Sequence, residues 1–431
     1  MAVTFAKQIV PESAHNLKTK KPKDTAARQQ RVPAWQPIYS AGTTVSIFFL
    51  IGIAFIPIGV GLLSASNSIQ EKTIPYTDCT DKNGRFCKKV IFNQNAVDRD
   101  CFCNITFQID ENWRGNVFIF YALTNFYQNH RRYLRSRNDY QLLGDMNPDN
   151  WGNTDDCDPY QYCDDSSNCC NGANGKEGCS NRVPNKTHYM PCGAIANSMF
   201  SDVISLRWVC NVFYGSFGSK NQITKIHCVL WYFNRFENSE VSLIRSGIAW
   251  ESDKKLKFKN PAECTSSSSN NTMECLKTQF QRFAKPKDWK KNLWELDTSN
   301  PANNGLQNED LILWMRPAAF SSFKKLYRKI NHTDDNNLIL SAEFEHGIPK
   351  GKYSLLIEYN FEVASFNGTK SIVISTLNVL GNKTPFLAIA YIIVGSICII
   401  MGIFFSLAHM KYGKRLTDVI SINRMTLYHE K

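Results

Sequence analysis

Two long runs of uncharged, largely apolar residues lie near the ends of the chain and divide it into five parts. Residues 43–65 and residues 385–408 contain no Asp, Glu, Lys or Arg. At 1.5 Å per residue each run would form a helix of roughly 35 Å, which is long enough to cross a bilayer. The pattern predicts a tail over residues 1–42, two transmembrane helices, a large domain over residues 66–384 and a second tail over residues 409–431.

Small residues recur at seven-residue intervals in both apolar runs. Gly52 and Gly59 are one such pair, and Gly395 and Gly402 are another. Residues seven apart lie on one face of a helix, and small side chains allow a second helix to approach closely. The runs are therefore predicted to pack against each other or against a larger membrane partner. The alternative is that glycine is simply common in membrane helices.

Short apolar segments separated by Asn- and Gly-rich turns fill the region between the two runs. Residues 117–122 are apolar at every position, as in a strand that is buried on both faces. Tyr353, Leu355 and Ile357 stand at every second position, as on one face of a strand. Residues 372–379 are rich in β-branched side chains. Short sequential strands favour an antiparallel arrangement over parallel βαβ units. We predict a mainly antiparallel, sandwich-like β domain with helical additions.

Three further elements are predicted from the same patterns. Residues 123–134 place apolar side chains at helical spacing, with Thr124 or Asn125 as the cap. Residues 311–315 form a continuous apolar run and are predicted as a strand. Apolar residues recur at helical spacing between residues 320 and 330, which predicts a helix there.

Four arginines crowd the segment that follows the buried strand at residues 117–122. They are Arg131, Arg132, Arg135 and Arg137. The general interpretation is a solvated basic face. The specific interpretation is a docking surface, because Arg is enriched at the energetic centres of protein interfaces. Spacing alone does not separate the two.

The net charge of +12 is distributed unevenly. Residues 1–40 carry seven Lys and Arg against two acidic residues, residues 409–431 carry five against two, and the long middle is nearly neutral. Because Lys and Arg gather on the cytoplasmic side of membrane helices, both termini are predicted to be cytoplasmic and the middle domain lumenal or extracellular. Neither a zinc-finger spacing nor a basic groove with interleaved aromatic residues supports nucleic-acid binding.

Fifteen cysteines are many for a cytosolic protein. Cys398 lies in the second apolar run, and the other fourteen lie between Cys79 and Cys275. An even number suits a disulfide framework in an oxidising compartment, which agrees with the predicted topology. Metal binding is the alternative, but no two Cys-x2-Cys pairs stand at zinc-ribbon spacing. Cys264 and Cys275 flank a polar loop that a bridge could close.

The first four cysteines suggest a nested arrangement. Cys101 and Cys103 would point to the same face of a strand, so they are poorly placed to pair with each other. Pairing Cys79 with Cys103 and Cys87 with Cys101 would close a hairpin.

Six Asn-x-Thr sequons lie in the middle domain, as expected for a domain outside the cytoplasm. The one at Asn382 is too close to the second apolar run for modification. We predict glycosylation at the remaining five, with the sequons in polar, loop-like sequence favoured first: Asn185, Asn270, Asn331, Asn104 and Asn367.

Catalytic motifs are absent from the sequence. It has no Gly-x-Ser-x-Gly, His-Glu-x-x-His or phosphate-binding Gly-x-x-x-x-Gly-Lys-Ser/Thr motif. It also lacks the Asp-Lys-Thr-Gly motif on which P-type ATPases are phosphorylated. We therefore predict that the chain is neither an enzyme nor a cofactor-binding protein.

Motifs spread over nearly the whole chain resemble those of one family, the cell cycle control protein 50 family, also called the transmembrane protein 30 family. The matching stretches are TAARQQRVPAWQP (25–37), FIPIG (55–59), CFC (101–103), the Arg-dense run at 116–142, PCGAIANSMF (191–200), SGIAW (246–250), NEDLILWMRPAAF (308–320) and GKYSLLIEYNF (351–361).

The resemblance implies a function in phospholipid transport. Members of the family are non-catalytic β-subunits of type-IV P-type ATPases, which flip phospholipids between leaflets. The resemblance implies a heterodimer with the ATPase catalytic subunit in contact with membrane lipids. It also implies a role in the exit of the ATPase from the endoplasmic reticulum and in its transport cycle. The expected locations are the endoplasmic reticulum, the Golgi or endosomes, and the plasma membrane.

The resemblance also implies particular residue roles. It implies the nested cysteine pairing described above, a bridge between Cys157 and Cys192, and an antiparallel β-sandwich. For contact with the ATPase we expect the two glycine pairs and four residues of the Arg-dense run: Arg131, Arg132, Tyr133 and Arg135.

Two features leave the prediction open. Residues 207–236 depart from the family and add Cys210 and Cys228, so they are either an insertion with its own bridge or the product of an unusual splice form. Four further cysteines in a polar insertion can pair in three ways: Cys163, Cys169, Cys170 and Cys179.

The alternative function is a free-standing cell-surface receptor or adhesion glycoprotein. Such a protein would share the topology, the sugars and the disulfide bridges.

Overall fold

The structure is a computed structural model that divides into two units, described separately. One unit contains the two long apolar helices, and the other runs from Leu62 to Pro385. The described residues are 25–28, 41–93, 100–152, 154–163, 187–209, 239–265, 272–333, 344–378, 381 and 383–413.

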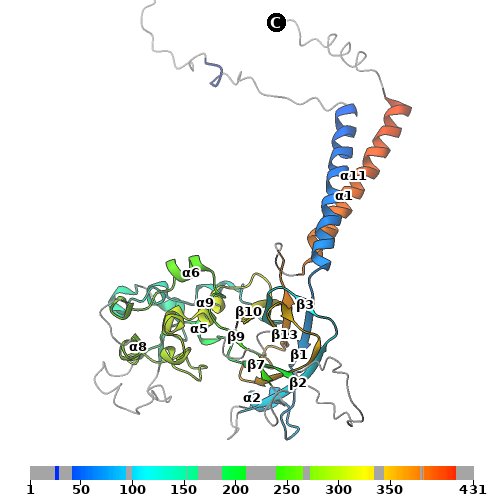
Figure 1. Cartoon of the computed structure of the whole chain (residues 1–431). Helices are drawn as coiled ribbons and strands as arrows, with labels where there is room; N and C mark the ends of the chain where they lie inside the picture. The colour runs from blue at the N-terminus through cyan, green and yellow to red at the C-terminus, as the bar shows by residue number, and fades with distance from the viewer. Residues whose placement is uncertain are drawn as a thin grey trace, which may run out of the picture. The chain divides into compact units, whose positions relative to one another are not determined.

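Both predicted apolar helices are present and extend beyond the predicted spans (Figure 1). Helix α1 covers Ala41–Asn67 and contains Pro57, and helix α11 covers Pro385–Tyr412. Each is long and apolar enough to cross a membrane. The aromatic pairs Phe48–Phe405 and Phe55–Tyr391 lie between them, with ring centroids 5.6 and 4.8 Å apart.

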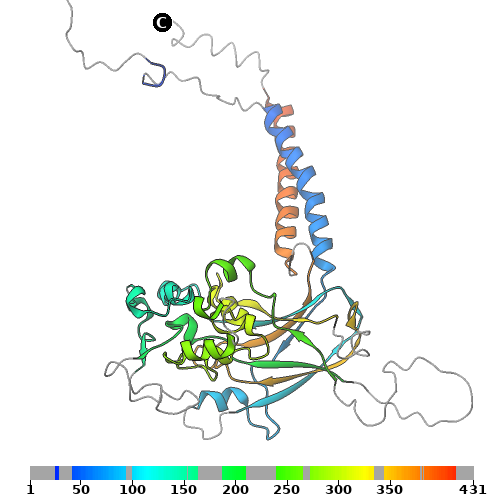
Figure 2. The ribbon, with the colours of Figure 1, turned by 60° about the vertical axis from the view of Figure 1, so that its left-hand side comes forward.

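The second unit is built on two larger antiparallel sheets (Figures 1 and 2), as predicted. The five-stranded sheet has the order β1 (Glu71–Pro75), β13 (Lys370–Thr376), β4 (Val117–Leu123), β10 (Phe323–Ile330), β9 (Leu243–Ile244). The four-stranded sheet has the order β2 (Phe102–Ile109), β12 (Gly351–Glu358), β7 (Val203–Val209), β8 (Ser239–Glu240). Two short pairs complete the described strands: β3 (Trp113–Arg114) with β11 (Gly347–Ile348), and β5 (Tyr162–Cys163) with β6 (Thr187–His188).

Short helices connect the strands of this unit. They are α2 (Cys87–Phe92), α3 (Arg131–Arg135), α4 (Asp139–Leu142), α5 (Ala194–Asn197), α6 (Glu251–Leu256), α7 (Ala262–Thr265), α8 (Thr272–Phe280) and α9 (Glu309–Met315). Single turns of 3-10 helix occur at Pro148–Asn150, Asp155–Cys157, Leu293–Glu295, Pro301–Asn303 and Gly305–Gln307.

The two sheets share one hydrophobic core. Tyr353, Leu355 and Ile357 on β12 are fully buried, as their alternation predicted. In the five-stranded sheet, one face of β4 is fully buried and the residues of the other face are at least partly buried, which explains its continuous apolar sequence.

A buried ion pair connects the two sheets. Lys370 begins β13, and its Nζ donates to Asp202 Oδ2 at 2.6 Å, with neither side chain exposed to solvent. Asp202 lies just before β7. Its other oxygen accepts hydrogen bonds from the backbone N–H groups of Asn360 and Phe361, which follow β12. One carboxylate therefore holds three strand ends together.

Aromatic and carbonyl groups surround this pair. The Tyr76 hydroxyl donates to Asp202 Oδ2 at 2.8 Å, and Lys370 Nζ lies 3.1 Å from the centroid of the Tyr359 ring. Lys370 Nζ also donates to the Phe361 carbonyl at 2.6 Å. Burial lowers the pKa of Lys370 to about 8 although Asp202 opposes this shift, and burial raises the pKa of Tyr76. Charge-assisted hydrogen bonds and the cation–π contact offset part of the cost of burying both charges.

The predicted strand at residues 311–315 and the predicted helix between residues 320 and 330 are both wrong. The first is helix α9, which the Asn308 side chain caps by accepting from the Leu311 N–H, with Glu309 and Asp310 in its first turn. The second is strand β10, in which a β-bulge between Leu326 and Arg328 shifts the register against β4. The bulge breaks the simple alternation, so the apolar positions imitate helical spacing.

The predicted helix over residues 123–134 is also largely wrong. Strand β4 continues to Leu123, and Asn125 has φ +59°, which is a turn conformation rather than a helical one. The helix begins only at Arg131. Of the apolar residues in between, Phe126 packs on the core from a loop and Tyr127 is exposed, so their spacing does not mark a helix face.

Four disulfides join pairs of described residues, with the pairings named in the sequence analysis: Cys79–Cys103, Cys87–Cys101, Cys157–Cys192 and Cys264–Cys275. Sulfur atoms of Cys79, Cys87 and Cys103 lie within 4.8 Å of one another. All three belong to disulfides and are therefore not available as thiolate ligands for a metal.

Several predictions concern segments that the structure does not describe. Cys163 is disulfide-bonded. The other insertion cysteines, the sequons at Asn185 and Asn270, and Cys210 and Cys228 lie outside the described residues. Within residues 207–236, the first three residues complete strand β7.

We expect the stability of the fold to depend strongly on the Lys370–Asp202 ion pair. Asp202→Asn or Lys370→Met alone leaves one buried charge without its partner and should lower the free energy of unfolding by about 3–5 kcal/mol. The double variant should lose less than the sum of the two, by about 1 kcal/mol or more. The measurement is denaturant unfolding of the full chain in mild detergent. Strictly additive losses would contradict the pairing.

The matched control is Lys324→Met. Lys324 forms a 2.8 Å pair with Glu71 across the same sheet, but both side chains are about one quarter exposed. Its loss should cost about 1 kcal/mol or less.

Candidate functional site

Helix α3 presents three arginines to solvent. Arg131, Arg132 and Arg135 are all exposed, and no residue of this helix is buried. Arg137, after the helix, pairs with Asp139 at 3.0 Å. Three of the four arginines in the Arg-dense run thus form one exposed basic group.

Tyr133 lies on the opposite side of the same helix and is partly buried. Its hydroxyl forms a 2.8 Å hydrogen bond with Ser198 Oγ, and its ring packs edge-on against Phe126 at 5.8 Å. Burial raises the pKa of Tyr133 to about 12. Tyr133, expected to contact the partner, therefore anchors the helix to the domain while the arginines point outward.

Phe126 is the centre of an aromatic cluster beneath the helix. Its ring lies within 6.4 Å of five other rings, which belong to Tyr133, Trp314, Phe323, Phe361 and Phe366. These rings come from α3, α9, β10 and the loop after β12. Aromatic pairs in these geometries add to the stability that burial alone provides, so α3 is fixed to the core.

Two exposed aromatic residues lie beside the arginines. The loop at residues 126–129 runs along the loop at residues 318–321, with hydrogen bonds from Phe126 N–H to the Ser321 carbonyl and from Asn129 Nδ2 to the Ala319 carbonyl. Tyr127 and Phe320, in these two loops, are 58% and 76% exposed. Large apolar side chains at this exposure indicate a binding surface when they gather in one place.

A Trp–Arg stack lies at the start of the segment that carries Phe320. The Arg316 guanidinium lies 4.2 Å from the centroid of the Trp250 ring and 3.5 Å from Asp253. Trp250 is 63% exposed. We call the combined set the basic aromatic surface: Tyr127, Arg131, Arg132, Arg135, Trp250, Arg316 and Phe320.

Helix α9 supports this surface from below. Glu309 accepts from the backbone N–H groups of Ile248 and Ala249 and pairs with Lys254 at 2.8 Å. Burial opposes ionisation of Glu309, but the hydrogen bonds from Ala249 and Lys254 outweigh it and lower the pKa of the carboxyl. The first turn of α9 thus holds the segment that carries Trp250.

The other end of α9 is capped by Lys325 of strand β10. Its Nζ donates to the carbonyl groups of Leu313, Trp314 and Arg316 at 2.7–2.9 Å. A helix leaves its last carbonyls without partners, and a cation there also matches the helix dipole. Burial lowers the pKa of Lys325 to about 7, with a further contribution from Arg316. Lys325 was predicted only as part of the wrongly assigned helix, and its cap could not be read from spacing.

The predicted glycine pairs lie where helices α1 and α11 meet. A Cβ atom at Gly52 would be 2.5 Å from Ile399 Cδ1, and one at Gly59 would be 2.7 Å from Ile392 Cγ1. Gly395 and Gly402 are buried in the opposite helix. The small residues therefore allow these two helices to pack against each other.

Comparison with known proteins gives one family over most of the chain. The chain matches the model of the LEM3 (ligand-effect modulator 3) family, also described as the CDC50 family, over residues 62–415. It is 39% identical to cell cycle control protein 50A of Mus musculus over 399 residues, covering 92% of this chain and 91% of the relative.

The chain belongs to the CDC50 family.

Other similar proteins carry informative names. The chain is 35% identical to cell cycle control protein 50B of Homo sapiens over 404 residues, with 92% and 96% of the two chains covered. It is 30% identical to ALA-interacting subunit 3 of Arabidopsis thaliana over 408 residues, with 94% and 91% covered. The names of these CDC50 relatives describe control proteins and an interacting subunit.

The glycine positions of this CDC50 protein give a direct test. Gly52→Leu should separate the two helices, because its side chain would meet Ile399 and the Gly395 backbone. Gly61→Leu is the matched control, since nothing lies within 4 Å of a Cβ there. The measurement is oxidative cross-linking of a Phe48→Cys/Phe405→Cys pair in a Cys398→Ser background. Equal cross-linking in both glycine variants would argue against this packing.

Lys325 predicts a pH dependence of stability. Its folded pKa of about 7 is below the value of about 10.4 in an unfolded chain, so between these values the unfolded chain binds an extra proton. The free energy of unfolding should therefore rise from pH 7 towards pH 10, and this contribution is lost as the pH falls through about 7.

The test measures the free energy of unfolding from thermal unfolding at several pH values between 7.5 and 9. It compares the slope of this free energy against pH in wild type and variants. Lys325→Met should reduce the slope by up to about 1.4 kcal/mol per pH unit. Lys324→Met, at the more exposed neighbouring position, should leave it unchanged. An unaltered slope in Lys325→Met would show that Lys325 stays protonated across this range.

Proposed function

We propose that this chain is the non-catalytic β-subunit of a type-IV P-type ATPase that moves phospholipids across a membrane. Membership of the CDC50 family over most of the chain supports this function. The name of ALA-interacting subunit 3 describes a subunit that interacts with ALA. In this role the chain forms a heterodimer with the catalytic subunit, assists its exit from the endoplasmic reticulum and supports its transport cycle.

The observation that carries the proposal is the basic aromatic surface. Exposed Trp, Tyr and Arg side chains that are held rigidly from below have the composition and preorganisation of interface hot spots. Arg131, Arg132 and Arg135 have no carboxylate within 4 Å among the described residues, so their charges are available to a partner. The complementary surface on the ATPase would be acidic or would offer backbone carbonyl groups.

A subunit of this kind acts through selective binding. It shifts the ATPase between conformations only if it binds one of them more tightly than the others. The rigid attachment of α3 through Tyr133 and Phe126 suits this task, because a surface of fixed shape distinguishes conformations better than a mobile one. Gly52, Gly59, Gly395 and Gly402 would fix the paired helices beside the membrane part of the ATPase.

We place both termini in the cytoplasm and the domain between the helices in the lumen or outside the cell. The disulfides and the basic tails support this topology. Glycosylation fits it as well: Asn104 lies exposed on β2, and Asn367 lies exposed in a turn. Asn331 is partly buried and bonds to Ser242, so its modification would require a local rearrangement.

Charge reversal tests the proposed contact. Arg131→Glu/Arg132→Glu should weaken association with the ATPase at least about tenfold, since two hot-spot residues typically contribute more than 1 kcal/mol each. The variant should accumulate with immature glycans and support less phospholipid translocation. The measurement is the amount of P-type ATPase that co-purifies in mild detergent, together with translocation activity.

The control changes two exposed cations outside the surface, Lys82→Glu/Arg114→Glu, and should behave as wild type. Unchanged assembly and translocation in a folded Arg131/Arg132 variant would remove these residues from the interface. A wild-type chain that reaches the surface with no ATPase bound would favour the receptor or adhesion function instead.

A further inference from the structure

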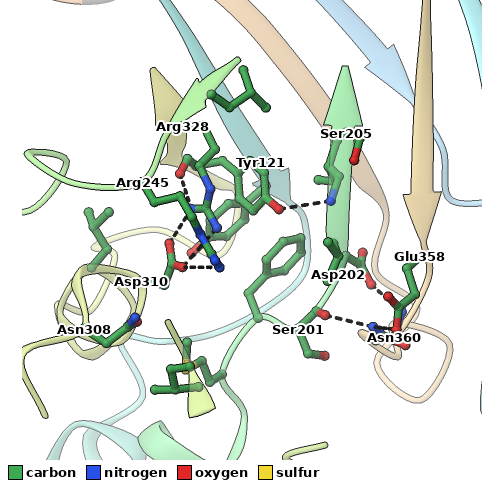
Figure 3. Close-up of a pocket in the computed structure, with 18 of the residues that line it drawn as sticks. Tyr121, Ser201, Asp202, Ser205, Arg245, Asn308, Asp310, Arg328, Glu358 and Asn360 are labelled. Carbon is green, nitrogen blue, oxygen red and sulfur yellow. Dashed lines mark hydrogen bonds and ion pairs between the residues drawn. The ribbon is translucent and has the colours of Figure 1, made fainter. Parts of the chain in front are cut away.

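A cavity of about 550 Å³ lies between the two larger sheets (Figure 3). Residues of β4 and β10 line it from the five-stranded sheet, and residues of β7 and of the end of β12 line it from the four-stranded sheet. Its volume falls within the range of small-molecule sites in proteins, about 300–1,000 Å³. The basic aromatic surface does not include it.

Much of the cavity wall is apolar. Phe200 stacks on Tyr121 with ring centroids 4.0 Å apart, and Met199, Ile204 and Leu313 continue the wall. A wall of this kind favours a ligand with an apolar body, because burying that body removes it from water.

Arg245 also lines the cavity and is only loosely held. Its guanidinium is 3.8 Å from Asp310 Oδ2 and 3.9 Å from Asp297 Oδ1, too far for ordinary hydrogen bonds, and its side chain is 40% exposed. Asp310 is already bound by both terminal nitrogens of Arg328, at 2.5 and 3.1 Å. The two aspartates therefore position Arg245 but leave its hydrogen-bond donors available.

Asp297 is likewise satisfied by other donors. It accepts from the Ser299 hydroxyl at 2.6 Å and from Asn303 Nδ2 at 2.8 Å. Lys291 adds a second exposed cation to the lining, whereas Lys290 is engaged with Asp100 at 3.0 Å and lies 3.5 Å from Glu358. Arg245, whose ion pairs with Asp310 and Asp297 are long, and Lys291 thus both present hydrogen-bond donors to the cavity.

One acceptor at the other end of the cavity lacks a donor. Asn360 Oδ1 is buried with no hydrogen-bond partner in the described part of the chain. The Asn360 amide is fixed, because its Nδ2 donates to the Ser201 carbonyl and to Glu358 Oε1, each at 3.0 Å. A buried acceptor without a donor is costly, so a water molecule or a ligand hydroxyl is expected there.

We propose that this cavity binds a small single-chain amphiphilic anion, a fatty carboxylate or a lysophosphatidate. The carboxylate or phosphate of the ligand binds the guanidinium of Arg245. This planar group donates two parallel hydrogen bonds to either kind of oxyanion. The apolar chain of the ligand lies against Met199, Phe200 and Leu313. Asn360 Oδ1, at the other end of the cavity, accepts from a water molecule.

The test uses the full chain in phosphatidylcholine nanodiscs with a short-chain fatty carboxylate that carries a photoreactive diazirine. After irradiation, mass spectrometry locates the labelled peptides. We expect labelling of residues that line the cavity, within 199–205 or at Asp310 and Leu313. Unlabelled decanoate and short-chain lysophosphatidate should compete, and the stronger competitor identifies the headgroup. An uncharged monoacylglycerol of equal chain length should compete at least about tenfold less, because it lacks a charge-assisted hydrogen bond to Arg245.

Two variants test the site itself. Arg245→Gln should reduce labelling of the cavity peptides about tenfold, and Ser205→Trp should abolish it by filling the space. Arg114→Gln, at an exposed arginine outside the cavity, should label as wild type. The positions labelled in wild type, and the order of its competitors, decide the matter even if a variant misfolds.

Three outcomes would overturn the proposal. They are wild-type labelling confined to residues outside the cavity, equal competition by the uncharged lipid, and unchanged labelling in a folded Arg245→Gln variant. None of these measurements requires the ATPase, so they are independent of the proposed subunit function.

Discussion

Burial of Lys370 and Asp202 as one ion pair is the constraint on which the larger unit depends. Neither charge reaches solvent, so each must be satisfied by the other and by nearby polar groups. Phe361 shows how far this requirement extends. Its N–H donates to Asp202, its carbonyl accepts from Lys370, and its ring packs against Phe126 and Phe200. The pair thus sets the position of the ring cluster under α3 and of one wall of the cavity.

Helix α9 contributes to both the basic aromatic surface and the cavity. Its first turn holds the Trp250 segment through Glu309, and Lys325 caps its last turn, next to Arg316. Two partly buried residues of the same helix, Asp310 and Leu313, line the cavity. A seven-residue helix would be marginal by itself, so its stability comes from these tertiary contacts. Both regions are therefore preorganised, which suits a protein whose proposed role is selective binding rather than chemistry.

The errors in secondary-structure prediction have a common cause. Four of the five residues at 311–315 are buried, and a short continuous apolar run does not distinguish a strand from a helix. The Asn308 cap and the acidic first turn were the signals that favoured a helix. In β10, the bulge and the burial of Lys325 and Arg328 replaced the expected alternation with apparent helical spacing. In both segments tertiary contacts determined the structure, and local pattern was a poor guide.

The sequence by itself determined the two apolar helices, the antiparallel β character of the domain between them and the family. Bilayer thickness, the two-residue period of a strand and motifs spread along the whole chain leave their marks in local sequence. The four described disulfide pairings also agreed with sequence reasoning. Only the tertiary structure decided that Tyr133 points inward, that Arg316 stacks on Trp250 and that Arg245 faces a cavity. These features depend on residues far apart in the chain, and no periodicity records which of them will meet.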